Sequence, residues 1–130
     1  MTGWIASVAA TALVFLVLDA LWLGKVARGF YRLRLGPLLA PRFRAGPAVA
    51  FYALYVTGLQ YFAISGATSP GAAALEGALF GLFCYATYDL TNWATLRDFP
   101  GSLAFVDTAW GTGLSAAAAA AGALARTAAG

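Results

Sequence analysis

The chain has 130 residues, of which 62% are hydrophobic and only 10% are charged, with 5 acidic side chains, 8 basic side chains and no histidine. A soluble domain has about a quarter of its residues charged, so these few ionisable side chains could not cover a water-facing surface. The lack of histidine excludes haem or zinc sites ligated by imidazole and every catalytic pair that uses one. The single cysteine, Cys84, excludes an internal disulfide. The composition therefore predicts an integral membrane protein.

Four apolar stretches are each about 20 residues long, the length that a helix needs to cross a hydrocarbon core of about 30 Å. They cover residues 4–24, 48–66, 72–94 and 102–125. We expect an all-α protein with a single membrane domain over residues 1–130, in which four transmembrane helices form a compact bundle. Because the first stretch lacks a positively charged leader and is long for a secretory signal, we expect it to be retained as a span.

Most of the basic side chains lie in the link between the first two stretches, residues 25–47, which contains no acid: Lys25, Arg28, Arg32, Arg34, Arg42 and Arg44. The positive-inside rule places this link and the short link 95–101 in the cytoplasm, with both termini in the periplasm of an inner membrane. Apolar residues alternate with the bases from Val26 to Leu35, which predicts a short interfacial helix that ends before Pro37. We expect these bases to contact anionic lipid headgroups, either by surface adhesion or through a headgroup pocket. The net charge of +3 therefore describes a membrane-facing link, and we expect no nucleic-acid partner.

Turn residues and small residues predict how the helices begin and pack. Ser69 followed by Pro70 is typical of an N-cap and first residue for the third helix, and Ser102 is expected to cap the fourth. Gly77 and Gly81 form a GxxxG pattern in the third stretch, and six consecutive alanines lie in the fourth. Small residues let helix backbones approach closely, so we expect tight packing within the chain and a shielded fourth helix. The sequence is compatible with assembly into a homo-oligomer or a larger membrane complex.

Three of the five acidic side chains, Asp19, Asp89 and Asp107, lie inside the apolar stretches. An acid within a span costs at least about 2.5 kcal/mol, so each of them requires a physical reason. At a rise of about 1.5 Å per residue, all three lie about 9–12 Å from the cytoplasmic ends of their helices. The topology deduced from the bases thus places the three acids in one layer.

Polar and aromatic side chains accompany these acids on the same helix faces. The expected cluster near the cytoplasmic leaflet contains Asp19, Trp22, Tyr52, Tyr55, Tyr85, Tyr88, Asp89, Asn92, Asp107 and Trp110. The cluster could be a structural network that supplies hydrogen bonds to the acids and fixes the register of the helices. Some of its aromatic residues could also belong to the belt that is common at membrane interfaces. Because three carboxylates in one layer repel one another unless protons or a cation intervene, we favour a site for a small polar or cationic ligand. The three acids are also candidate metal ligands.

Two other classes of function stay open. A buried carboxylate could act as general acid or base in a membrane-embedded enzyme with a lipid or isoprenoid substrate. The small-residue helices and the basic link would also suit an accessory subunit of a larger membrane complex. The sequence identifies no cofactor and names no reaction.

Several strings resemble the bacterial family DUF2177, small predicted four-span inner-membrane proteins of unknown function. They are Asp19–Gly24, Phe51–Tyr52, Tyr85–Leu96 and Val106–Gly111, and the Tyr-Asp-x-Thr-Asn block at residues 88–92 is the most specific. The resemblance covers nearly the whole chain. It implies a four-helix fold in an inner membrane and no particular activity.

Overall fold

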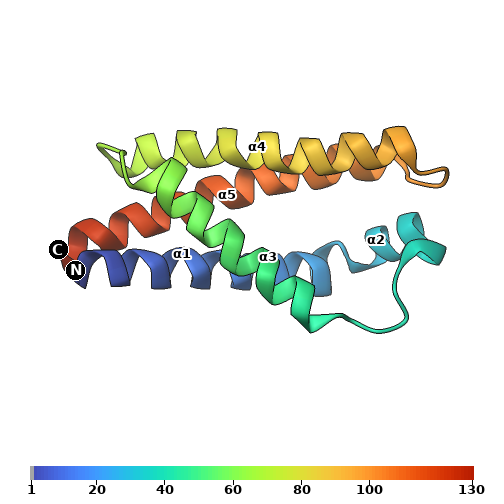
Figure 1. Ribbon diagram of the computed structural model, residues 1–130, viewed down its shortest axis with the longest axis horizontal. Coiled ribbons are helices and arrows are strands. Elements are labelled where there is room, and N and C mark those ends of the chain that lie inside the picture. The colour runs from blue at the N-terminus through green and yellow to red at the C-terminus, as the bar shows by residue number, and fades with distance from the viewer. Residues whose placement is uncertain (1) are drawn as a thin grey trace.

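The computed structural model describes residues 2–130, which form helices joined by short connections (Figure 1). The helices are α1 (Thr2–Leu21), η1 (Trp22–Val26), α2 (Arg28–Leu35), η2 (Gly36–Leu38), α3 (Ala45–Gly58), η3 (Leu59–Ile64), α4 (Pro70–Thr95) and α5 (Gly101–Ala129). η1 and η3 are π-helical turns that continue α1 and α3, and η2 is a 3-10 turn. The prediction of an all-α protein is confirmed.

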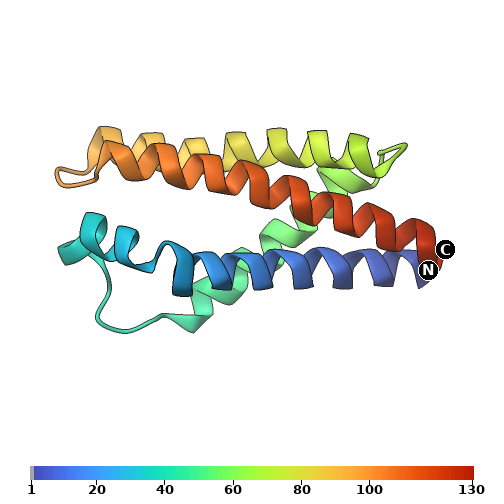
Figure 2. The ribbon, with the colours of Figure 1, turned by 180° about the vertical axis from the view of Figure 1, so that it is seen from behind.

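α4 and α5 form a long antiparallel hairpin, and α1 packs along α5, as Figure 2 shows from behind. α3 and η3 cross the other helices diagonally (Figure 1). One end of the molecule holds both termini and the turn 65–69. The other end holds residues 22–44, which include most of the link, and the loop 96–100. α5 is the central helix because it contacts α1, α4 and η3. Its alanines Ala118 and Ala119 are buried, while Phe105 and Leu124 are exposed, so the expected shielding holds for one face of this helix only.

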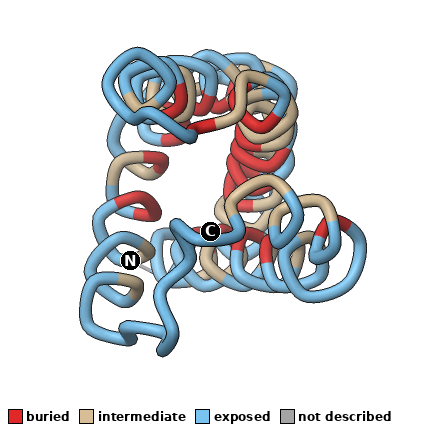
Figure 3. Tube along the Cα trace, turned by 90° about the vertical axis from the view of Figure 1, so that its right-hand side faces the viewer, coloured by how far each residue is buried: buried red, intermediate tan, exposed pale blue. Residues whose placement is uncertain are grey.

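On α1, the inward face carries mostly small and polar residues, and large apolar residues face outward. The buried face of α1 takes every fourth residue: Gly3, Ser7, Thr11, Phe15 and Asp19. Ile5, Leu13 and Val17 are exposed on its other faces. Figure 3 shows that the buried residues lie where the helices face one another. This is the reverse of a helix in water, and it suits a protein whose outer surface meets hydrocarbon.

Two helices are long and apolar enough to cross a membrane, Thr2–Val26 and Ala45–Ile64. α4 and α5 are longer, with 26 and 29 residues, but glycine, threonine, aromatic and charged residues lower their hydropathy. Two helices of residues 2–130 therefore have both the length and the hydropathy of a membrane span. The sequence predicts four spans.

Two of the three local predictions at helix ends are correct. Ser69 caps α4 by accepting a hydrogen bond from the Ala72 amide at 3.0 Å, and α2 is the short helix predicted to end before Pro37. Its place at a membrane interface stays a prediction. The prediction that Ser102 caps the fourth helix is wrong, because α5 begins at Gly101 after an extended Pro100. The Ser102 hydroxyl accepts a hydrogen bond from Arg34 Nε at 2.9 Å instead and joins α5 to α2.

The GxxxG pattern of α4 is used inside the chain. A Cβ atom on Gly77 would lie 2.7 Å from the Ser115 carbonyl oxygen, and one on Gly81 would lie 2.6 Å from the Gly111 carbonyl oxygen. Two backbones at this separation leave no room for a side chain between them. The expected packing of small residues within the chain is confirmed.

We expect Gly81→Ala to destabilise the protein by about 1–3 kcal/mol, because the α5 backbone would have to move away. Gly113→Ala is the matched control in a neighbouring turn of α5, since no atom lies within 4 Å of a Cβ there. The free energy of unfolding can be measured by titration with dodecyl sulfate in mixed micelles. Equal stabilities for the two variants would contradict the importance of this close approach.

Candidate functional site

A pocket of about 510 Å³ opens among α1, α3, α4 and α5, towards the end that carries the link. Its walls are Asp19, Leu23, Phe43, Ala48, Phe51, Tyr52, Tyr55, Cys84, Tyr85, Tyr88 and Asp107. The pocket exists because α4 packs closely on η3 and far less on α3. Gly58 lies against the ring of Phe80 at the closed side, where a Cβ would be 2.7 Å from the ring. Towards the link, aromatic side chains on both helices hold α3 and α4 apart.

Asp19 lies on the wall of this pocket and is only 6% exposed. The hydroxyl of Tyr52 donates a hydrogen bond to Asp19 Oδ2 at 2.7 Å, and Trp110 Nε1 donates to Asp19 Oδ1 at 3.2 Å. Both partners are neutral, so they satisfy the oxygens without cancelling a negative charge. The carboxyl group therefore joins α1, α3 and α5 at one point.

Asp107 is the second acid on the pocket wall, and its partner comes from the link. The Tyr31 hydroxyl donates to Asp107 Oδ1 at 2.6 Å and accepts from Trp22 Nε1 at 3.2 Å. Burial and the hydrogen bond to Asp107 raise the pKa of Tyr31 above its ordinary value, so the phenol stays protonated as a donor. The cluster predicted from the sequence omits Tyr31, whose only signal is its place among the apolar residues of the predicted interfacial helix.

Asp89 lies outside the pocket, fully buried between α4 and α5. Thr108 Oγ1 donates to Asp89 Oδ2 at 2.9 Å, while Oδ1 has no hydrogen-bond partner among the residues that the structure describes. Asp89 is close enough to Asp107 for the two carboxyl groups to interact electrostatically. The structure thus brings two of the three predicted acids to the pocket and keeps the third behind it.

The structure does not gather the three acids, the candidate metal ligands, into one group. No group of three or more acidic, cysteine or histidine side chains in residues 2–130 is placed to hold a metal ion. Each carboxyl group turns towards a different partner, Tyr52 for Asp19, Tyr31 for Asp107 and Thr108 for Asp89. Depth along the helices places the acids at one level, but it does not determine the direction in which each side chain points.

The aromatic residues of the predicted cluster occupy different places. Trp22 and Trp110 stack with ring centroids 4.4 Å apart and planes 5° from parallel, and neither is on the pocket wall. The Tyr55 hydroxyl shares a hydrogen bond of 2.7 Å with Ser115 Oγ, while its ring packs on Tyr85 with centroids 5.9 Å apart.

Two predicted residues lie at the margin or outside the pocket. Tyr88 is 61% exposed at the rim, and half-buried Asn92 lies beyond the pocket wall, one turn closer to the loop 96–100. Cys84 and Phe43 are wall residues that the predicted cluster omits. Neither side chain is charged, so neither stands out in the sequence as a costly residue within an apolar stretch.

A second polar set lies deeper in the molecule and is missing from the sequence prediction. Gln60 Nε2 donates to Ser7 Oγ at 3.2 Å and to Thr11 Oγ1 at 3.0 Å. Ser7 and Thr11 are fully buried, and Gln60 belongs to η3. These neutral side chains carry no charge to signal them, although a polar side chain in hydrocarbon also requires a partner. The set fixes η3 against α1.

The six basic residues of the link lie at the end of the molecule next to this pocket. Arg34 is engaged by Ser102, and its guanidinium lies over the Phe30 ring, 4.5 Å from the centroid. The other five are exposed: Lys25, Arg28, Arg32, Arg42 and Arg44. Their contact with lipid headgroups stays a prediction.

We expect Tyr31→Phe to loosen α2, because the change removes the hydroxyl that joins the link to Asp107 and Trp22. Amide hydrogen exchange measured by mass spectrometry should become faster across Arg28–Leu35 and stay unchanged in α4. Tyr61→Phe is the matched control, since Tyr61 is 72% exposed. Unchanged exchange in α2 would show that this hydrogen bond does not hold the link.

Comparison with known families agrees with the membrane-type surface and with the resemblance noted from the sequence. A family model described as "Predicted membrane protein (DUF2177)" matches residues 4–124. Neither the curated proteins nor the solved structures contain a match. The chain belongs to the DUF2177 family of predicted membrane proteins.

Proposed function

We propose that this protein crosses the bacterial inner membrane four times, with the link 25–47 in the cytoplasm and both termini in the periplasm. α4 and α5 contain 26 and 29 residues, more than the roughly 20 that a span requires. The link and the loop with Arg97 lie at one end of the molecule, and Arg126 lies near the other. Seven of the eight bases are therefore at the same end, which the positive-inside rule assigns to the cytoplasm.

The orientation can be tested with single cysteines, because Cys84 is the only native one. In a Cys84→Ala background, Thr68→Cys in the turn 65–69 should react with a membrane-impermeant maleimide added to intact spheroplasts. Arg42→Cys in the link should react only after the membrane is permeabilised. The reverse pattern would invert the topology, and reaction of both sites in intact spheroplasts would contradict the single span that this topology places between them.

Within this topology, we propose that the pocket binds a small organic cation with apolar groups. The observation that carries this proposal is the composition of the wall, which among residues 2–130 has two carboxyl groups and several aromatic rings but no lysine or arginine. Phe51, Tyr52 and Tyr85 offer ring faces, which attract organic cations, while Asp19 and Asp107 offer opposite charge. The hydrogen-bond donors to these two acids, Tyr52, Trp110 and Tyr31, are neutral, so a bound cation would supply the positive charge that they lack.

The position of the pocket also favours a ligand that enters from the bilayer. The wall between α3 and α4 is made of their diverging halves, at a depth where the neighbouring surface is apolar. Beyond the pocket, buried Leu59 and Ile64 fill the interior of the molecule. This arrangement supports binding, and movement of the ligand across the membrane would require these side chains to rearrange.

We expect methyltriphenylphosphonium to protect Cys84 from alkylation in detergent-solubilised protein, because the thiol is on the pocket wall. The double variant Asp19→Asn, Asp107→Asn should weaken this protection about tenfold or more, which corresponds to about 1.4 kcal/mol. Asp98→Asn is the matched control, because it removes an exposed acid in the loop 96–100. Triphenylphosphine oxide, a neutral molecule of similar shape, should protect poorly.

Equal protection by the neutral molecule, or unchanged affinity in the double variant, would contradict a cation site. The lipid composition of a deletion strain then becomes informative. Altered acyl or headgroup chemistry would point to a membrane-embedded enzyme with a lipid or isoprenoid substrate. Stoichiometric copurification with other proteins in mild detergent would point to an accessory subunit.

A further inference from the structure

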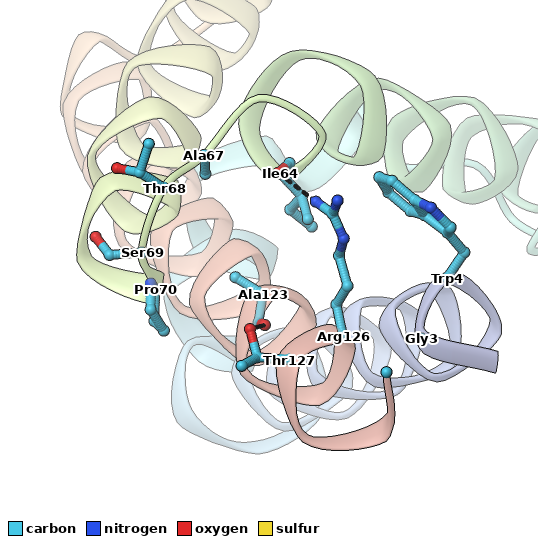
Figure 4. Close-up of a pocket in the computed structure, with 11 residues that line it drawn as sticks. Gly3, Trp4, Ile64, Ala67, Thr68, Ser69, Pro70, Ala123, Arg126 and Thr127 are labelled. Carbon is cyan, nitrogen blue, oxygen red and sulfur yellow. Dashed lines mark hydrogen bonds between the residues drawn. The ribbon is translucent and has the colours of Figure 1, made fainter. Parts of the chain in front are cut away.

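A second cavity, of about 720 Å³, lies at the opposite end of the molecule (Figure 4). It is bounded by the turn 65–69, the start of α4, the last turns of α5 and the start of α1. Its wall is more polar than that of the first pocket and includes Thr68, Ser69, Arg126 and Thr127, with Trp4 at one side. No aspartate or glutamate side chain of residues 2–130 lines it. The charge of its side chains is therefore opposite to that of the first pocket.

Arg126 is the charged residue of this cavity and is held in a defined position. Its Nη1 atom donates to the carbonyl oxygens of Ile64 and Ser65, at 3.4 Å in each case. Its guanidinium lies over the Trp4 ring, 3.9 Å from the centroid, as the close-up shows. A guanidinium has five N–H donors, and the two carbonyl contacts use only one of its nitrogen atoms. Donors therefore remain for an anion in the cavity.

The start of α4 adds a second electropositive element to the wall. Ser69 Oγ accepts from the Ala72 amide, which leaves the hydroxyl proton of Ser69 available to donate. Pro70 begins a helix of 26 residues, and the N-terminus of a helix carries a partial positive charge that favours anions. The hydroxyl of Thr68 lies in the same turn. A full positive charge, hydroxyl donors and a helix N-terminus thus border one cavity, together with the last turn of α5 and Gly130.

We propose that this cavity binds a phosphate group at the membrane surface. A planar guanidinium matches the oxygens of phosphate with two parallel hydrogen bonds, which a simple point charge does not provide. Trp4 places the cavity at the level of headgroups, where indole rings are enriched in membrane proteins. The phosphate would belong either to a lipid headgroup or to a free phosphate ion. The proposal is separate from the cation pocket, because the two share no wall residue.

Binding can be measured by thermophoresis of the full chain in dodecyl maltoside at fixed low salt. The probes are dioctanoyl phosphatidic acid, dioctanoylglycerol, which lacks the phosphate, and inorganic phosphate. We expect phosphatidic acid to bind and dioctanoylglycerol to bind at least about tenfold more weakly, since it lacks the phosphate that would accept charge-assisted hydrogen bonds. Binding of inorganic phosphate as well would assign the site to the free ion, and its failure to bind would assign the site to the headgroup.

Arg126→Gln should weaken phosphatidic acid binding about tenfold or more, whereas Arg97→Gln, which removes one charge at the other end, should not. Because Arg126 also joins η3 to α1, a second pair of variants leaves its contacts intact. Thr68→Glu places a negative charge on an exposed turn residue, and Thr68→Gln is its neutral control. We expect only the glutamate to weaken binding. Equal affinities for this pair, equal loss from Arg97→Gln, or equal binding of dioctanoylglycerol would overturn the proposal.

Discussion

A carboxyl group inside a helical membrane protein has to find its hydrogen-bond donors within the protein, because the surrounding hydrocarbon offers none. That constraint is most visible at Asp19, where donors from α3 and α5 meet an acid on α1. The three helices are thereby fixed at one level. Tyr31 does the same for Asp107 and brings α2 against the others. Much of the architecture around the link follows from satisfying these two groups.

The size of side chains along α4 accounts for the rest of the shape. Gly77 and Gly81 let α5 approach until backbone meets backbone. Further along the same helix, Tyr85 and Tyr88 are large, and they face the aromatic residues of α3 across the pocket. Gly58 lies against Phe80 where α3 ends, and bulky rings lie between α3 and α4 towards the link, so α3 diverges from α4 in that direction. The pocket is therefore a consequence of a gradient in residue size along the helices.

The sequence predicts the class of the fold well because the relevant signals are local. Apolar length, the cluster of bases and the Ser69–Pro70 pair each depend on neighbouring residues only, and they locate the helices and the α2 segment. The predicted layer of acids combines such signals over long distances. It places Asp19 and Asp107 on one pocket, but it cannot show that Asp89 turns towards Thr108. Rotation about each helix axis is set by tertiary contacts, and those are absent from local patterns.

The roles of uncharged polar residues are the hardest to predict from the sequence. Gln60, Ser7 and Thr11 form a buried set without any charge to reveal it. Tyr31 lies in a segment whose bases suggest only adhesion to lipid, although its hydroxyl is one of the donors at the pocket. In both cases the residue type is common in membrane proteins, and only the position of its partner distinguishes it.

The hydrogen bond between Tyr31 and Asp107 has a consequence for communication across the membrane surface. One oxygen of Asp107 is already occupied by a residue of the link, so a cation that approaches this acid competes with the Tyr31 hydroxyl for it. Thermodynamic linkage is reciprocal: whatever a bound ligand does to the docking of α2, the docking of α2 does equally to the affinity for that ligand. Binding of a ligand in the pocket would then change the mobility of α2, the short basic helix at the aqueous side.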